Sequence, residues 1–333
     1  MRKLTLAALA CTVAISAPAA AQKYNLTVAG YSPGGLVSTI GVGMDKALNK
    51  AYPGSTLTYQ TSSGGLANAL LVSQGKVPLG FISDMEALVF KEGQKPFKAP
   101  ITNLRMLFKP YVGAYRFQAT HVLVQKSWAE ENGIKTFEDI AKKKPKMRVA
   151  VNRPGNLDGD ASIAGFEAIG VKLDDIEKWG GQVVRAASKE MASLMLDRRL
   201  DVISFGISYN HPTVREVAKG IEIAMLPMSK EVGDAIAKKM GSQPCEFKAK
   251  EYDFLAADSA SACVGLGVFV RDDMDEKTAY NVTKAVFDNI DDYKNAHRLL
   301  QKTVTPQYLA EPGIVAYHPG AAKYLKEKGL LKQ

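Results

Sequence analysis

The sequence predicts an α/β protein of two lobes, each a mainly parallel sheet flanked by helices. Three observations support this fold class. Strand and helix patterns alternate along the chain, turns of glycine, serine and aspartate join strands to helices, and the same succession occurs twice. A chain of 333 residues is also long enough for two domains rather than one.

The N-terminal segment, residues 1–21, has the pattern of a secretion signal. Arg2 and Lys3 precede an apolar run over residues 4–15, and alanines at 19–21 form a small-residue cleavage site. The apolar run is shorter than the roughly 20 residues that span a bilayer. The pattern therefore predicts export to the periplasm and a mature chain that begins at Gln22.

The composition is mildly basic, with 43 lysines and arginines against 34 acidic residues. The basic residues are spread over what read as solvated helix faces, and aromatic residues are not interleaved with them. Nucleic acid is therefore not an expected partner. The charge weakly favours an acidic ligand, and we expect a monomer.

Two cysteines, Cys245 and Cys263, remain after the signal segment. Oxidation is permitted in an exported protein, so a disulfide that closes a local loop is plausible. Two buried thiols are the alternative, and the spacing does not decide between them. A zinc site is not expected, because the sequence has no Cys-x-x-Cys pair and no Cys/His cluster.

The first lobe begins with three strand and helix units. Strands are predicted near residues 26–29, 57–60 and 79–82, and each runs into a turn that opens a helix. Ser83 and Asp84 are the expected N-cap of the third helix. Because parallel strands need crossover connections, we expect parallel strands whose turns share one edge of the sheet.

The second lobe repeats this pattern. Strands are predicted near residues 120–125, 147–151, 182–185 and 201–206. The glycine-rich stretch NRPGNLDGDAS, residues 152–162, opens one of the intervening helices, Ser188 caps another, and Pro212 suits the first position of a third.

The chain then returns to the first lobe through an apolar run over residues 265–270. One long amphipathic helix follows, with Ala279, Val286 and Tyr293 on its apolar face. This order gives two hinge crossings between the lobes, near residues 120–126 and 264–270. We therefore assign residues 22–121 and 268–333 to lobe 1 and residues 122–267 to lobe 2, with a cleft between the turns.

Five segments together resemble the TAXI family of solute receptors, which serve tripartite ATP-independent periplasmic (TRAP) transporters. They read GYSPGGLVSTIG, SSGGLANALLVSQGKVPLGFISD, THVLVQKS, FVRDDMDEKTAYNVTKAVFDNID and YHPGAAKYLKEKG, and they occur in the family's order over nearly the whole chain. The resemblance implies a two-lobed periplasmic binding protein of type II and no enzymatic activity. It also implies that a small acidic solute (a dicarboxylate, a keto acid or an amino acid such as glutamate) passes to the membrane subunits of a TRAP permease. The loop residues differ from the family's usual ones, so the resemblance implies the fold and not the ligand.

The candidate ligand-binding residues lie on the turns of both lobes, where backbone N–H and hydroxyl groups suit a carboxylate. In lobe 1 they are Gly34, Gly35, Leu36, Ser38, Ser62, Ser63, Gly64, Gly65, Asn68, Ser83 and Asp84. In lobe 2 they are Arg153, Asn156, Asp158, Asp160, Gly206 and Ser208.

Three of the lobe 2 candidates are charged and allow alternatives. Arg153 offers a planar pair of donors to a carboxylate, or it is a solvated loop charge. Asp158 and Asp160 could receive a ligand amine, or they cap the next helix, which is the preferred role for Asp160.

The same segment partly matches a calcium loop. Its spacing places Asn156, Asp158, Asp160, Ser162 and Glu167 at ligand positions. However, Ala161 stands where such a loop needs glycine, and a strand rather than a helix precedes it. We therefore expect neither a metal nor any other cofactor.

No catalytic residue is expected. His121 lies in an apolar alternating strand, where a hydrogen-bonded core histidine is favoured over a base, and the sequence has no Gly-x-Ser-x-Gly turn. Two other functions remain open. One is an exported hydrolase that uses the same cleft, and the other is a two-lobed receptor for an ATP-driven or tricarboxylate transporter.

Overall fold

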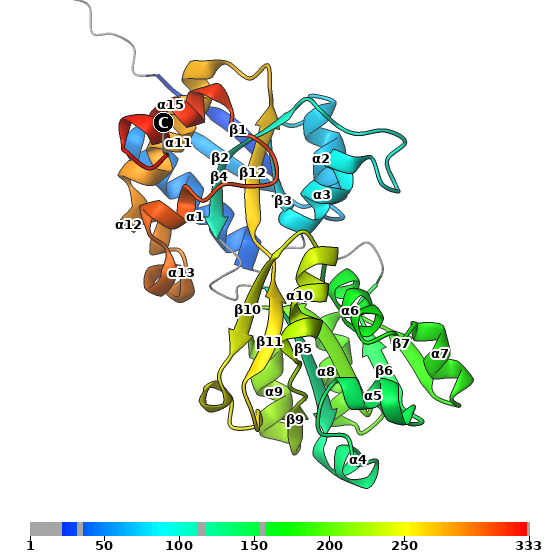
Figure 1. The fold of residues 1–333 in the computed structure, drawn as a ribbon. Coiled ribbons are helices and arrows are strands. Elements are labelled where there is room, and N and C mark those ends of the chain that lie inside the picture. Colours follow the sequence, from blue (N-terminus) through cyan, green and yellow to red (C-terminus); the bar gives the residue numbers. More distant parts are fainter. Residues whose placement is uncertain (1–21, 32–35, 112–117, 154–156, 332–333) are drawn as a thin grey trace, which may run out of the picture.

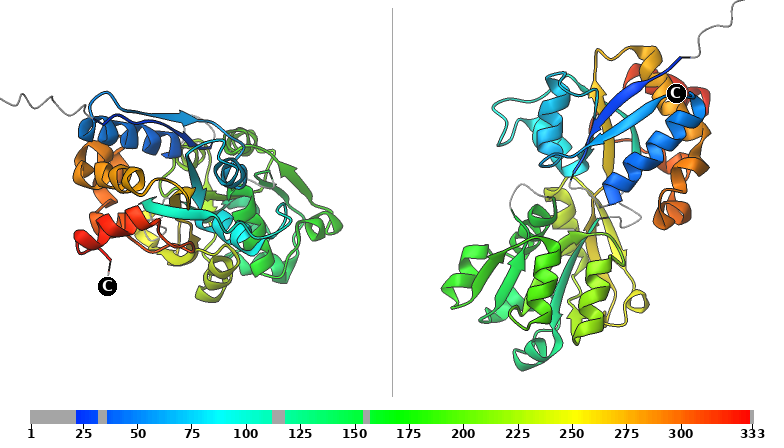
Figure 2. Two further views of the ribbon diagram at one scale, coloured as in Figure 1. Left: turned by 90° about the horizontal axis from the view of Figure 1, so that it is seen from above. Right: turned by 180° about the vertical axis from the view of Figure 1, so that it is seen from behind.

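Two sheets, each flanked by helices, form two lobes that lie one above the other in Figure 1 and again in the view from behind in Figure 2. The structure is a computed structural model that describes residues 22–31, 36–111, 118–153 and 157–331. The two-lobed α/β fold expected from the sequence is confirmed. The predicted signal segment, residues 1–21, lies outside the described residues.

The sheet of the first lobe has the strand order β2-β1-β3-β12-β4. Its strands are β1 (Asn25–Ala29), β2 (Thr56–Gln60), β3 (Leu79–Ser83), β4 (Leu104–Tyr111) and β12 (Leu266–Arg271). The first three are parallel, whereas β12 runs antiparallel between β3 and β4. The sequence did not predict β4, which contains a proline and lies at the edge of the sheet, where a missing N–H is tolerated.

Helices cover both faces of this sheet. Those after the first strands are α1 (Leu36–Ala51), α2 (Gly65–Ser73) and α3 (Asp84–Glu92), and those near the C-terminus are α11 (Glu276–Asp288), α12 (Ile290–Lys294), α13 (Arg298–Thr303), α14 (Pro306–Leu309) and α15 (Pro319–Glu327). Ile40 and Met44 of α1 share a buried cluster with Val282 of α11, whereas α2 and α3 contribute to a separate cluster. The long helix predicted near residues 279–293 is divided in two at Asn289.

The sheet of the second lobe has the order β10-β11-β5-β8-β6-β7, and β9 also pairs with β5. Its strands are β5 (Ala119–Gln125), β6 (Arg148–Val151), β7 (Gln182–Arg185), β8 (Val202–Ile207), β9 (Ile223–Met225), β10 (Gln243–Phe247) and β11 (Ser259–Cys263). Only β7, β6 and β8 form parallel pairs among these described strands. The sheets are therefore mixed rather than mainly parallel, because the strands near the crossings run against their neighbours.

The helices predicted to open within residues 152–162, at Ser188 and at Pro212 are present, together with others that the sequence did not predict, and Ser188 is the first residue of its helix rather than the cap. The helices of the second lobe are α4 (Lys126–Glu131), α5 (Glu138–Lys143), α6 (Leu157–Ala168), α7 (Leu173–Lys178), α8 (Ser188–Leu196), α9 (Pro212–Gly220) and α10 (Lys230–Lys239), and a short 3-10 helix covers Ala249–Glu251. One buried cluster joins α6 and α10 to one face of the sheet, and another joins α8 and α9 to the other face. No helix within the described ranges is both long and apolar enough to cross a membrane.

The strand pairings move the two crossings away from the predicted boundaries. Residues 119–121, assigned to lobe 1 from the sequence, pair with residues 205–207 of β8 in the second sheet. Leu266 and Gly267, assigned to lobe 2, pair with β3 in the first sheet. The second crossing, between Val264 and Gly265, still lies within the predicted range 264–270, whereas the first precedes the predicted range 120–126, because apolar alternation identifies a strand but not its partners.

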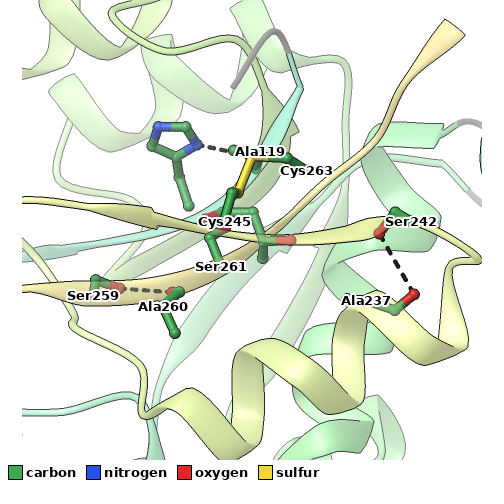
Figure 3. Close-up of a disulfide and its surroundings, with 10 residues drawn as sticks. Ala119, Ala237, Ser242, Cys245, Ser259, Ala260, Ser261 and Cys263 are labelled. Carbon is green, nitrogen blue, oxygen red and sulfur yellow. Dashed lines mark hydrogen bonds between the residues drawn. A yellow bond between two sulfur atoms is a disulfide. The ribbon is translucent and has the colours of Figure 1, made fainter. Parts of the chain in front are cut away.

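A disulfide joins Cys245 and Cys263, whose Cα atoms are 5.7 Å apart (Figure 3). It links the antiparallel strands β10 and β11 at the edge of the second sheet. This resolves the alternative that the sequence left open in favour of the disulfide. Cys263 directly precedes Val264, where the chain leaves the second lobe for the first. The disulfide therefore also restrains the second-lobe end of that crossing.

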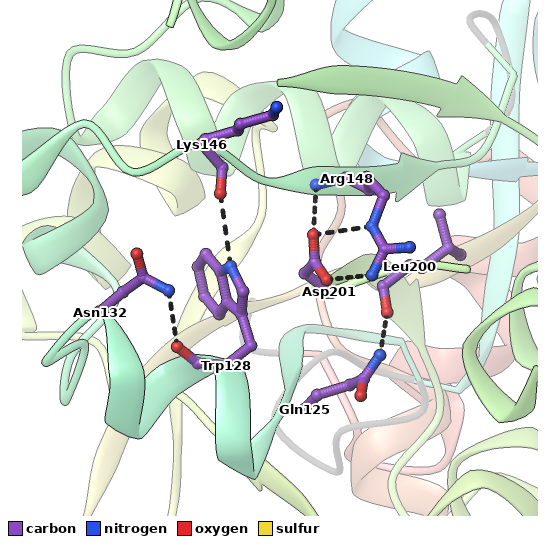
Figure 4. Close-up of polar contacts among 7 residues, drawn as sticks. All are labelled: Gln125, Trp128, Asn132, Lys146, Arg148, Leu200 and Asp201. Carbon is purple, nitrogen blue, oxygen red and sulfur yellow. Dashed lines mark hydrogen bonds and ion pairs between the residues drawn. The ribbon is translucent and has the colours of Figure 1, made fainter. Parts of the chain in front are cut away.

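Hydrogen bonds join the segments around the amino ends of β6 and β8 in the second lobe (Figure 4). Asp201 accepts the backbone N–H of Arg148 at 2.7 Å and its Nε–H at 3.1 Å. Nearby, Gln125 donates to the carbonyl of Leu200 and Trp128 donates to the carbonyl of Lys146. The polar groups named here are therefore paired with one another. The carboxyl ends of the parallel strands lie at the opposite end and face the other lobe.

Candidate cleft between the lobes

A cavity of about 630 Å³ lies between the two lobes, beside the carboxyl ends of parallel strands from both sheets. The predicted site residues that line it are Leu36, Ser62, Ser63, Gly64, Arg153, Asp158, Gly206 and Ser208. Turns that are far apart in the sequence therefore share one hollow. Their roles in binding stay predictions.

The remaining candidates divide into two groups. Gly34, Gly35 and Asn156 lie outside the described residues. Ser38, Gly65, Asn68, Ser83, Asp84 and Asp160 are described but do not line the cavity. Of this second group, Gly65, Asn68 and Ser83 form hydrogen bonds within the first lobe.

The beginnings of helices surround the cavity. Leu36 of α1, Leu157 of α6 and Ser188 of α8 are first residues of helices in the lining. Gly64 and His211, the N-caps of α2 and α9, also line it. Because a helix carries partial positive charge and unpaired N–H groups at this end, the cavity provides an environment that favours an anion.

The carboxylate of Glu86 joins the turns of the first lobe and is almost fully buried. It accepts the N–H of Gly65 at 2.8 Å, and from Ser83 it accepts the N–H at 2.9 Å and the hydroxyl at 2.6 Å. It also accepts the hydroxyl of Tyr31. Glu86 thus connects the segments that follow β1, β2 and β3.

This arrangement corrects the predicted roles of several lobe 1 residues. The N–H groups of Gly65 and Ser83, expected to bind the ligand, are already bonded to Glu86. A side chain at residue 65 would overlap the Glu86 carboxylate, so this position requires glycine. Asn68 is also buried, and its amide donates to the carbonyls of Gly30 and Phe81. An internal carboxylate therefore occupies part of the anion-binding arrangement that the sequence indicated.

Tyr31, whose hydroxyl donates to Glu86, also lines the cavity. Burial, followed by the negative charge of Glu86, raises the pKa of Tyr31 well above its usual value. Its backbone N–H donates to the hydroxyl of Tyr59 at 2.6 Å. Tyr31 is thus neutral and has a fixed orientation, with its hydroxyl hydrogen donated to Glu86.

Asp84 is turned away from the cavity and forms an ion pair with Lys109 at 3.1 Å. Both side chains are buried. The sequence presented Asp84 as a polar residue at a strand end, but it did not predict β4, which supplies the lysine.

In the second lobe Asp158 has the role that Glu86 has in the first. Its carboxylate accepts the amide of Asn152 at 3.0 Å, the hydroxyl of Ser188 at 2.6 Å and the N–H of Gly206. These partners follow β6 and β7 and lie in β8, so one carboxylate again joins three strand ends. At Gly206 a Cβ atom would lie 2.6 Å from the Cβ of Ala161, which explains the glycine there.

Burial raises the pKa of the Asp158 carboxyl, and its three hydrogen bonds oppose this rise. The folded protein therefore binds this proton at a higher pH than the unfolded chain does. The resulting stability is present at low pH and is lost as the pH rises through the folded pKa. We expect the difference in unfolding free energy between wild type and Asp158→Asn to shrink over this range in urea titrations. Replacing the exposed Asp174 with asparagine is the control, and an equal pH dependence in both variants would contradict the assignment.

The calcium-loop pattern does not form a calcium loop. Asp158, Asp160 and Ser162 lie on one continuous helix, α6, and the Ser162 hydroxyl donates to the carbonyls of Asp158 and Ser204. Glu167 forms an ion pair with Lys239 instead. Asp160 lies inside the first turn of α6 rather than at its N-cap, so the preferred capping role is also wrong.

Arg153 brings a positive charge to the lining from an exposed position. Its backbone N–H donates to Oδ1 of Asn152 at 2.8 Å, which fixes the start of the side chain. Pairing of its guanidinium with a carboxylate stays a prediction.

The histidines have structural partners. His121 is fully buried, and its ring nitrogens contact the carbonyl of Ala119 at 2.8 Å and the hydroxyl of Tyr252 at 3.1 Å, which confirms the core role. His211 lines the cavity, but its Nδ1 accepts the N–H of Thr213 as the cap of α9. Burial, followed by the charge of Arg215, lowers the pKa of His211, so the ring is neutral at pH 7. No observation favours the hydrolase.

Sequence reasoning did not select several residues of the lining. Tyr31 and Ser188 adjoin strand ends, and this signal could have identified them. Tyr111 and Gln118 flank the first crossing, and His211 precedes a helix that begins with proline. A larger hollow, of about 1100 Å³, lies beside α4, α9 and β9, where it collects equal numbers of acidic and basic side chains and is away from the strand-end turns.

Comparison with known proteins agrees with this architecture. The model of the NMT1-like family matches residues 28–329. The structure of PhnD1 from Prochlorococcus marinus, in complex with methylphosphonate, is similar with a TM-score of 0.54 and 11% identity, over 92% of this chain and 98% of that one. A Xanthomonas citri protein bound to chloride gives a TM-score of 0.52 and 11% identity, over 92% and 96%. At these identities the likeness shows a shared fold, the two-lobed fold of periplasmic binding proteins.

Proposed function

Because the chain belongs to the NMT1-like family, we propose that it is a periplasmic receptor that captures a small organic anion or amino acid between its lobes. The observation that carries this proposal is the cavity itself, which is lined by strand-end turns and helix beginnings from both lobes. A solute in this cavity contacts both lobes at once. It therefore favours the closed arrangement to the extent that it binds that arrangement more tightly.

Each wall of the cavity has its own role in this mechanism. Glu86 and Asp158 hold the two sets of turns in place before the solute arrives. Ser63 offers hydroxyl and N–H groups from the first lobe, and Arg153 offers its guanidinium from the second. Ser62 and Gly64 shape this wall, because the Ser62 hydroxyl donates to the carbonyl of Gly30 and the Gly64 N–H donates to the Ser62 hydroxyl. Such preorganisation lowers the cost of ordering the site on binding.

The proposed partner is the membrane part of a TRAP permease. This proposal rests on the five segments that resemble TAXI receptors, and the permease would recognise the closed form. A receptor for an ATP-driven or tricarboxylate transporter is the second candidate. The similar PhnD1 structure holds methylphosphonate, so a phosphonate belongs among the solutes to be tested.

Thermal melting with a panel of solutes tests the proposed function. The panel comprises dicarboxylates, keto acids, amino acids including L-glutamate, and methylphosphonate, each with and without calcium. We expect one chemical class to raise the melting temperature saturably, because a ligand that binds only the folded state stabilises it by mass action. No shift with any compound, or turnover of a bound compound, would contradict the proposal.

Replacing Arg153 with methionine should weaken binding of an anionic solute about ten- to a hundredfold, since hydrogen bonds to a charged group contribute roughly 1.5–3 kcal/mol. The control is Arg199→Met, which removes an exposed arginine of the same lobe that is not in the lining. Titration calorimetry measures both variants. Equal affinities would show that Arg153 is only a solvated loop charge.

A further inference from the structure

The second crossing changes lobe between two adjacent residues. Val264 donates its N–H to the carbonyl of Gln118 at 2.9 Å, just before β5 of the second lobe. The next residue, Gly265, donates its N–H to Oδ2 of Asp84 at 3.0 Å and accepts the N–H of Asp84 at 3.1 Å. The attachment to the second lobe thus ends, and that to the first begins, across a single peptide bond.

Asp84 is itself held from two directions. Lys109 of β4 lies 3.1 Å from one carboxylate oxygen and 3.2 Å from the other. Asp84 is also the first residue of α3, directly after the N-cap Ser83, whose hydroxyl bonds to Glu86. The group that holds Gly265 is therefore fixed to the frame of the first lobe.

This attachment adjoins the cavity. Leu266, which follows Gly265, lines the cavity and pairs with Ser83 and Tyr111 in the first sheet. Tyr111 and Gln118, on either side of the other crossing, also line it. A rotation about the φ and ψ bonds of Val264 would change the distance between the cavity walls and leave the pairing of both sheets at this crossing intact.

We propose that Asp84 is a positioning residue that, with Lys109, fixes Gly265 to the first lobe, so that the lobes rotate about the Val264–Gly265 peptide. The link between rotation and solute binding rests on the function proposed above. The location of the pivot does not, because it is a property of the solute-free protein.

The test compares the variant Asp84→Ala/Lys109→Met, which removes both charges and the acceptor of the Gly265 N–H, with the control Asp291→Ala/Lys294→Met. The control removes an ion pair of the same lobe in which Asp291 is exposed. Hydrogen exchange of the solute-free protein, read residue by residue, is the measurement. We expect the Gly265 amide to exchange at least tenfold faster in the first variant, whereas the amides of Leu107 and Val268 keep their wild-type rates. The radius of gyration should also increase, because the angle between the lobes is less restricted.

Two outcomes would overturn the proposal. One is a Gly265 amide that exchanges as slowly as in the control. The other is an equal acceleration of all amides in the first lobe, which indicates general loss of stability rather than a released pivot. If the double variant does not fold, Asp84→Ser/Lys109→Met decides the question, since the shorter serine side chain also removes the Oδ2 atom that accepts the Gly265 N–H.

A second arm adds L-glutamate to the wild type. We expect Gly265 to remain protected with and without the solute, and a change of tenfold or more would place the pivot elsewhere. If the wild type binds none of the panel compounds, the proposed function fails, whereas the solute-free exchange rates still test the pivot.

Discussion

Replacing Glu86 with alanine should lower the free energy of unfolding by about 4 kcal/mol, since each buried donor left without a partner costs roughly 1–3 kcal/mol. The donors concerned are the N–H groups of Gly65 and Ser83 and the hydroxyl of Tyr31. The same change should abolish solute binding, because the turns of the first lobe lose the group that joins them.

Urea unfolding followed by circular dichroism measures this loss. The matched control is Glu92→Ala, which removes an exposed glutamate from the end of the same helix. Both tryptophans, Trp128 and Trp179, lie in the second lobe, so their fluorescence shows whether that lobe still unfolds as in the wild type. A Glu86→Ala variant as stable as Glu92→Ala would refute the assigned role.

Removing the disulfide, in the double variant Cys245→Ser/Cys263→Ser, should lower the free energy of unfolding by about 3 kcal/mol. The cross-link spans a sequence separation of 18, and in the chain-entropy account it restricts the unfolded state by this amount. The loss should appear mainly in the second lobe, because β10 and β11 lie at the edge of its sheet.

Tryptophan fluorescence during urea unfolding measures this loss of stability in the second lobe. Reduction of the wild type should reproduce the loss, and the reducing agent should leave the double variant unchanged. If the double variant unfolds at the wild-type urea concentration, the disulfide does not contribute to stability.

The sequence predicted most of the architecture because the signals it used are local. Strand and helix alternation identified the units of both lobes, and Ser83 is the N-cap that its position indicated. The edge strand β4 did not have a clear alternating pattern, since it is buried at nearly every position and contains Lys109 and Pro110. The direction of β5 and β12 relative to their neighbouring strands depends on which lobe contains the preceding strand. No local pattern in the sequence indicates which lobe that is.

The candidate site was predicted in outline but not in its internal connections. The Ser-x-x-Glu spacing of Ser83 and Glu86 indicates a capping box, and the structure has one. The further bonds of Glu86 to Tyr31 and Gly65 join residues 55 and 21 positions away, which only the folded chain brings together. The sequence alone therefore does not distinguish a polar strand-end residue that faces the cavity from one that supports the cavity wall.

If both lobes hold one solute, the solute should protect both walls of the cavity together. Hydrogen exchange of the wild type, with and without the panel compound that gives the largest thermal shift, is the measurement. We expect this compound to slow exchange together in segments 61–66 and 204–211, which line the cavity from opposite sides. Slower exchange in one of these segments alone, or near residues 218–227 of the larger hollow, would contradict it.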